Sequence, residues 1–126
     1  MITEDRLEQS LKFLAETDES SAEASANVKY LERLLKRKKA LFIMHDRELK
    51  SISAKEHAFY ASDIYNKAVE ELFQAEVKST TMENKRDKEG LIIDLFRTLE
   101  ASRRKHNILF ISLKYGLGNP CIQKFI

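Results

Sequence analysis

Runs of basic residues are the clearest chemical signal in this sequence. Lys36-Arg37-Lys38-Lys39 are four consecutive cations, and Lys29 and Arg33 precede them at helical spacing. Cations held along a helix neutralise phosphates, and the resulting affinity falls with salt and does not depend on base sequence. A second run is Arg103-Arg104-Lys105. The candidate nucleic-acid-binding residues are therefore Lys36, Arg37, Lys39, Arg103, Arg104 and Lys105.

Each cluster also has an interpretation that needs no ligand. The first run can be a solvated helix face, with the stem of Lys38 covering apolar neighbours. The second run can lie in a last helical turn, where cations meet the helix dipole and cap free carbonyls. Both interpretations stay open at the level of sequence.

Residues that could support catalysis are few and poorly arranged. His45-Asp46 and Glu56-His57 flank an expected turn, but their spacing matches no metal-ligand pattern. The single cysteine, Cys121, has no histidine near it in sequence. We find no phosphate loop and no nucleophile elbow. We therefore expect a non-enzymatic protein with no catalytic residue, cofactor or metal, and treat a metal site at the turn as a minor alternative.

Composition excludes most fold classes. The chain has 126 residues, of which Leu, Ile, Val and Phe supply 35, and it contains 3 Gly and 1 Pro. This apolar content is enough for a core, whereas the scarcity of turn-forming residues argues against β-sandwiches and barrels. No stretch reaches the ~20 apolar residues of a membrane span, and the acidic first nine residues are unlike a secretory signal. We expect one all-α, cytoplasmic domain without membrane contact.

Helix signals predict three helical segments. The first begins at the N-cap Thr3, and the chain is expected to be interrupted or bent at Thr17–Ser21. A capping box at Ser20 and Glu23 then starts a second helix that runs to about Glu48. A third starts at the capping box of Ser53 and Glu56 and continues to about Arg104, with a kink at Gly90. The apolar stripe of the second helix is Val28, Leu31, Leu35 and Phe42, with Lys38 between the last two. The coiled-coil seam of the third is Ala58, Ala61, Tyr65, Ala68, Leu72, Ala75, Ser79 and Met82.

These lengths predict a long, coiled-coil-like antiparallel helical hairpin with a short N-terminal helix. Residues 20–48 would pair with residues 54–82, and the first helix would cover the overhang of the third. The expected contacts are Leu7, Leu11 and Leu14 against Leu95, Phe96 and Leu99. A second copy of the chain is the alternative cover. Such a hairpin has a thin core, so a homodimer through its remaining apolar edge is also compatible with the sequence. The aromatic residues Phe59, Tyr60, Tyr65 and Phe73 lie at seam positions and predict core.

The last residues break the helical pattern. Asn107 is a suitable stop, residues 108–113 are apolar with strand propensity, and Gly116, Gly118 and Pro120 favour a loop. We therefore predict one helical-hairpin domain over residues 1–107 and a C-terminal extension, poorly ordered or docked, over residues 108–126.

Three stretches resemble a known group of proteins: residues 11–19, residues 22–41 ending in LERLLKRKKAL, and residues 95–107 ending in SRRKHN. The pattern is similar to small helical proteins encoded in phage and prophage early regions, often near genes for single-strand annealing or binding proteins. The resemblance implies an accessory protein of DNA recombination or replication, with a protein partner and single-stranded DNA as the expected contacts. The alternative is a purely structural coiled-coil adaptor or oligomerisation protein that binds no nucleic acid.

Overall fold

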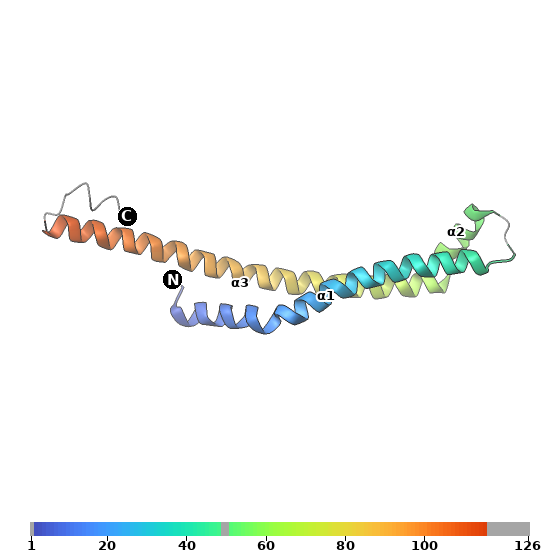
Figure 1. Ribbon diagram of the computed structural model, residues 1–126, viewed down its shortest axis with the longest axis horizontal. Helices are drawn as coiled ribbons and strands as arrows, with labels where there is room; N and C mark the ends of the chain where they lie inside the picture. Colours follow the sequence, from blue (N-terminus) through green and yellow to red (C-terminus); the bar gives the residue numbers. More distant parts are fainter. Residues whose placement is uncertain (1, 49–50, 116–126) are drawn as a thin grey trace. The chain divides into compact units, whose positions relative to one another are not determined.

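The computed structural model describes residues 2–48 and 51–115. Its elements are, in chain order, α1 (Glu4–His45), α2 (Ile52–Tyr60) and α3 (Asp63–Tyr115) (Figure 1). No strand occurs in this described part, and α1 packs against α3, so the predicted all-α helical hairpin is confirmed. The chain divides into two compact units. The hairpin unit is Glu16–Arg86, and the terminal unit combines Met1–Ala15 with Asp87–Ile126.

Two contacts define how the helices of the hairpin unit run. Near one end, Arg86 of α3 lies 3.3 Å from the Asp18 carboxylate of α1. Near the other, Lys39 of α1 lies 2.9 Å from the Tyr60 hydroxyl of α2. Residue numbers therefore rise along one arm as they fall along the other, which confirms the antiparallel pairing predicted for residues 20–48 and 54–82.

A heptad-spaced seam joins α1 and α3 in the hairpin unit. Alternating steps of three and four residues place one side of each helix against the other, as in a coiled coil. The α1 positions, all buried or half-buried, are Thr17, Ser21, Ala24, Val28, Leu31, Leu35, Lys38 and Phe42. The α3 positions, also buried or half-buried, are Tyr65, Ala68, Leu72, Ala75, Ser79, Met82 and Arg86. The seam predicted for residues 65–82 is confirmed, whereas Ala61 is exposed and lies outside it.

The predicted break between a short N-terminal helix and the next helix is wrong, because α1 is continuous from Glu4 to His45. Its start is as predicted, with the Arg6 amide donating to Thr3 Oγ1 at 3.1 Å. Ser20 does not cap a new helix; its hydroxyl donates to the Thr17 carbonyl at 3.2 Å. Bonding back to the preceding turn lets a serine remain inside a helix.

The start of the second arm of the hairpin, which consists of α2 followed by α3, also differs from prediction. The N-cap of α2 is Ser51, whose Oγ accepts from the Ala54 amide at 3.1 Å, and the predicted capping box at Ser53 does not form. The arm is then interrupted at Ala61 and Ser62. The Ser62 hydroxyl donates to the Phe59 carbonyl at 2.5 Å and accepts from the Tyr65 amide at 3.3 Å, which ends α2 and caps α3.

At the other end of the second arm, α3 continues without a break through Gly90 to Tyr115. The predicted stop at Asn107 is therefore wrong, and residues 108–113 are helical despite their strand propensity. Extending an existing helix adds one hydrogen bond per residue, which offsets the roughly 1 kcal/mol cost of an internal glycine. The rest of the predicted C-terminal extension, residues 116–126, lies outside the described residues.

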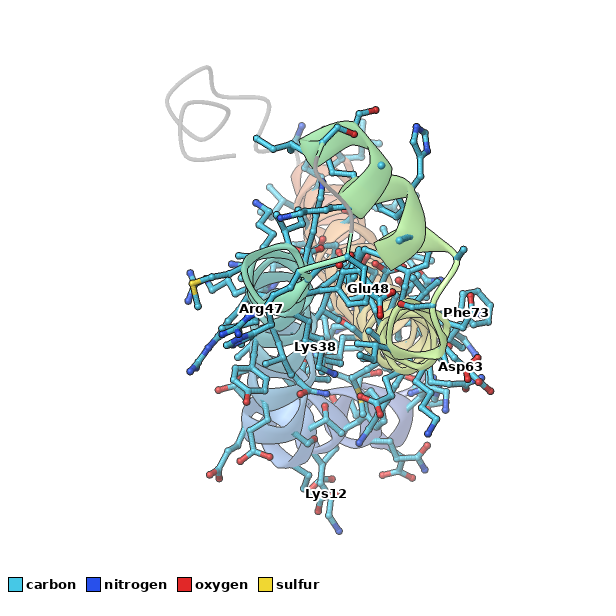
Figure 2. The ribbon with its side chains drawn as sticks, turned by 90° about the vertical axis from the view of Figure 1, so that its right-hand side faces the viewer. Lys12, Lys38, Arg47, Glu48, Asp63 and Phe73 are labelled. Atoms are coloured by element: carbon cyan, nitrogen blue, oxygen red, sulfur yellow. The ribbon has the colours of Figure 1, made fainter. Side chains whose placement is uncertain are left out.

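An aromatic cluster closes the turn end of the hairpin unit. The Phe59 ring, 1% exposed, has neighbouring ring centroids at 5.5–5.6 Å. These rings belong to Phe42 of α1, Tyr60 of α2 and Tyr65 of α3. The expectation of a core position is confirmed for Phe59 and wrong for Tyr60 and Phe73, which are 46% and 58% exposed. Phe73 points away from α1 in the end-on view of Figure 2. One buried ring thus holds all three helices together.

In the terminal unit, a polar group takes the place of apolar seam residues. Arg6 donates from Nη1 and Nη2 to the two carboxylate oxygens of Glu89, at 2.9 and 3.0 Å. The fully buried Ser10 donates to Glu89 Oε2 at 2.6 Å and accepts from Arg6 Nη1 at 2.8 Å. These hydrogen bonds, first from Arg6 and then from Ser10, lower the pKa of Glu89 to about 2.

The N-terminal segment therefore lies against α3 as predicted, but with a different register. Leu95 and Leu99 remain 50% and 46% exposed. Glu89 pairs with Arg6, and the buried Ile93 lies one turn further along the same side of α3. Leu95 and Leu99 lie on a different side of the helix, so the contacts predicted for them fail, whereas the third predicted residue, Phe96, is half-buried.

We expect Phe59→Ala to lower the free energy of unfolding by about 3–5 kcal/mol, because it leaves a cavity among three helices. Phe73→Ala is the matched control, and truncating this exposed ring should change stability by less than about 0.5 kcal/mol. Urea unfolding followed by circular dichroism measures both. Equal losses for the two variants would contradict the assignment of Phe59 as the centre of the core.

The Glu89 group predicts a stability change in acid. A lowered folded-state pKa contributes stability above the unfolded-state value, and that contribution is lost as pH falls from about 4.5 to about 2. The stability difference between the wild type and Glu89→Gln should therefore shrink across this interval. Glu8→Gln, an exposed carboxylate of the same unit, is the control. A difference that stays constant with pH would show that Glu89 is not held by Arg6 and Ser10.

Candidate nucleic-acid interface

The outer side of α1 in the hairpin unit carries a row of cations. Lys29, Arg33 and Arg37 recur every four residues, and Lys36 lies three residues after Arg33, so the four share one side of the helix. All four are exposed, and helical geometry places them roughly opposite the seam residues. Among the described residues none of the four forms an ion pair. We call Lys29, Arg33, Lys36 and Arg37 the cationic face.

Lys39, a sequence-predicted member of this site, is engaged elsewhere. Its ammonium group donates to the Tyr60 hydroxyl at 2.9 Å and lies 3.7 Å from Glu56 Oε1. The hydrogen bond to Tyr60 is the largest cause of the raised pKa of Lys39. The structure therefore places Lys39 in the contact between α1 and α2, while Lys36 and Arg37 are exposed together on the cationic face.

The second predicted cluster lies inside a helix instead of at its end. Since α3 continues to Tyr115, Arg103, Arg104 and Lys105 are about 15 Å from the helix terminus along its axis. The helix-dipole explanation considered from the sequence therefore does not apply, because that effect is confined to the last turn. Arg103 lies 2.9 Å from Glu100 Oε2, and all three side chains are exposed.

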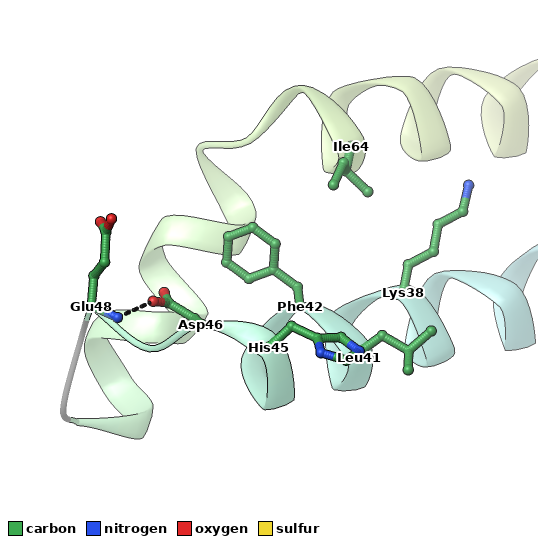
Figure 3. A pocket seen from close by; sticks show the side chains of 7 residues that line it. All are labelled: Lys38, Leu41, Phe42, His45, Asp46, Glu48 and Ile64. Carbon is green, nitrogen blue, oxygen red and sulfur yellow. Dashed lines mark hydrogen bonds between the residues drawn. The ribbon is translucent and has the colours of Figure 1, made fainter.

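An open hollow of about 590 Å³ lies beside the turn end of the hairpin unit (Figure 3). Phe42, Leu41 and Ile64 give it an apolar lining, and Lys38 reaches from α1 towards α3 at one side. The other lining residues are His45, Asp46 and Glu48. Asp46 Oδ1 accepts from the Glu48 amide at 3.0 Å and so shapes the chain just beyond α1. Such a hollow can receive an apolar side chain of a partner, but its arrangement offers no nucleophile with a base.

The described residues contain neither a cluster of metal ligands nor a membrane-spanning helix. Over residues 2–48 and 51–115, no group of three or more His, Cys, Asp or Glu is placed to hold a metal ion. The pairs His45-Asp46 and Glu56-His57 therefore do not assemble into a cluster there. None of the helices, over the range that the structure describes, combines the length and apolar character needed to cross a bilayer.

Sequence reasoning assigned no role to Tyr30. Its side chain is 60% exposed and lies on α1, three residues before Arg33 and seven before Arg37. The spacing that links Tyr30 to the cationic face was visible in the sequence. The high exposure of its ring became evident only when the seam of α1 was located.

Comparison with known protein families, curated proteins and solved structures finds no match for this chain. The resemblance to phage-encoded helical proteins therefore stays a prediction, and function must be argued from the surfaces described above.

Proposed function

We propose that this chain is a non-enzymatic accessory protein of DNA recombination or replication, which contacts nucleic-acid backbones through the cationic face of α1. The observation that supports this most directly is the exposure of Lys29, Arg33, Lys36 and Arg37 on one side of the helix, with no acidic partner among the described residues. From Lys29 to Arg37 the helix axis rises about 12 Å, comparable with three or four phosphates of one duplex strand, which follow each other at roughly 3.4 Å along the duplex axis. Contacts of this type are independent of base sequence.

The outer side of α3 supports a protein contact in the same unit. Val69, Phe73 and Val77 recur every four residues and are all exposed. A shallow hollow beside them is lined by Phe73, Glu76, Val77, Thr80 and Thr81. An exposed apolar stripe of this kind is typical of protein-interaction surfaces. In this proposal, nucleic acid binds α1, and a protein partner or a second copy of the chain binds α3.

Replacing Lys36 and Arg37 by alanine should weaken binding to every DNA sequence alike. Loss of two phosphate contacts is expected to reduce single-strand affinity roughly tenfold at physiological salt and to flatten the log–log salt dependence by about 1.4. Fluorescence anisotropy with labelled oligonucleotides at several salt concentrations measures both quantities.

The matched control is Lys67→Ala combined with Lys78→Ala, two exposed cations of α3. This variant has the same net charge as the first but keeps the cationic face. Equal weakening by both variants would show that net charge alone attracts DNA, and unchanged binding by the first would reject the proposed site.

The stripe on α3 favours a second candidate function, a structural adaptor that oligomerises without binding nucleic acid. In that case light scattering should give a dimer or larger species, and Phe73→Ser should dissociate it because the variant puts a hydroxyl into an apolar contact. The wild type would then show no DNA binding at physiological salt. A monomeric wild type that binds DNA would eliminate this alternative.

A further inference from the structure

The surroundings of Tyr30 differ from those of Tyr60 and Tyr65. The Tyr60 and Tyr65 rings pack against each other with centroids 5.1 Å apart, and both contact Phe59. Over the described ranges, Tyr30 has no ring neighbour, no hydrogen-bond partner for its side chain and no cation over its ring. Tyr30 therefore makes no contact within the described residues that would explain an aromatic side chain at this exposed position.

The surroundings of Tyr30 leave its ring accessible. A helical side chain leans over the preceding turn, so this ring lies over Ala26 and Asn27, both of which are short and exposed. The following turns carry Arg33 and Arg37 on the same side. A flat aromatic group with guanidinium groups along one edge is the arrangement that binds stacked bases and their phosphates together.

We propose that Tyr30 stacks on an unpaired base, so that the cationic face prefers single-stranded nucleic acid to duplex. This inference rests on the proposed function, since the cations must first hold the backbone. Base faces within a duplex are covered by neighbouring pairs, whereas a single strand can turn a base onto the ring. The phosphate contacts are common to both forms, and stacking on Tyr30 is available only to the single strand.

The test compares a deoxythymidine oligonucleotide with a duplex of equal length, using the full chain. Tyr30→Ala should weaken single-strand binding by roughly 5- to 150-fold, the range for losing one stacked base. It should leave duplex binding and the salt dependence of both substrates unchanged. Tyr30→Phe, which keeps the ring, should retain single-strand affinity, and Tyr30→Leu, which keeps only apolar area, should not.

Phe73→Ala is the matched control, because it removes an equally exposed ring from α3 and should not change binding to either substrate. Thermal unfolding of each variant excludes a folding defect, since Tyr30 makes no core contact. Equal affinity for single strand and duplex, or equal weakening of both by Tyr30→Ala, would overturn the inference. If replacing both Lys36 and Arg37 by alanine still weakened binding to both substrates, the proposed function would stand without the stacking role of Tyr30. Absence of any binding by the wild type would overturn both proposals.

Discussion

Charged and polar groups placed in the helix–helix seam determine how α1 can lie against α3. In the terminal unit Glu89, with only 15% of its side chain exposed, meets Arg6 and the buried Ser10. In the hairpin unit Arg86 donates to Thr17 Oγ1 at 2.7 Å and to Asp18. A half-buried charge is costly unless it is paired. A slip of one heptad would replace Arg6 by Phe13 opposite Glu89, so the pairing selects one register where an all-apolar seam would permit several.

The register in turn decides which residues face outward. Because Val28, Leu31 and Leu35 occupy the seam, residues half a turn away must be exposed, and these include Arg33 and Arg37. Alanines at positions 24, 68 and 75 are buried and allow close approach of the helices, so the seam is narrow. A narrow seam leaves most of each helix at the surface. The cationic face of α1 and the apolar stripe of α3 therefore follow from the same packing arrangement.

The apolar part of this arrangement was predictable from sequence, and the polar part was not. The stripe from Val28 to Phe42 and the alanine-rich seam of α3 follow from heptad spacing alone. Thr17, Ser20 and Ser21 were interpreted as a break because serine and threonine favour helix starts, yet Thr17 and Ser21 continue the seam. For a serine or threonine, a helix-cap position and an internal helix position differ in free energy by only about 1 kcal/mol. Local sequence signals therefore cannot decide between the two positions. Lys36 and Arg37 could be identified as candidates from their charge alone. The hydrogen bond between Lys39 and Tyr60 could not be predicted, because it depends on the break between α2 and α3 at Ser62.

The placement of the cations also bears on the proposed function. Lys29 with Arg33 and Arg33 with Arg37 are like charges four residues apart, which destabilise a helix by roughly 0.2–0.5 kcal/mol per pair. Glu32 lies three residues after Lys29 and four before Lys36, but it forms an ion pair with neither in the structure. Solubility would be served equally well by mixed charges, and α3 has such a mixture over the same unit, with Lys67, Glu70, Glu71, Glu76 and Lys78. The like charges on this side of the helix repel each other in the free protein, and phosphates lying against them would remove that repulsion. The proposed function requires this difference in energy between the free and the bound protein.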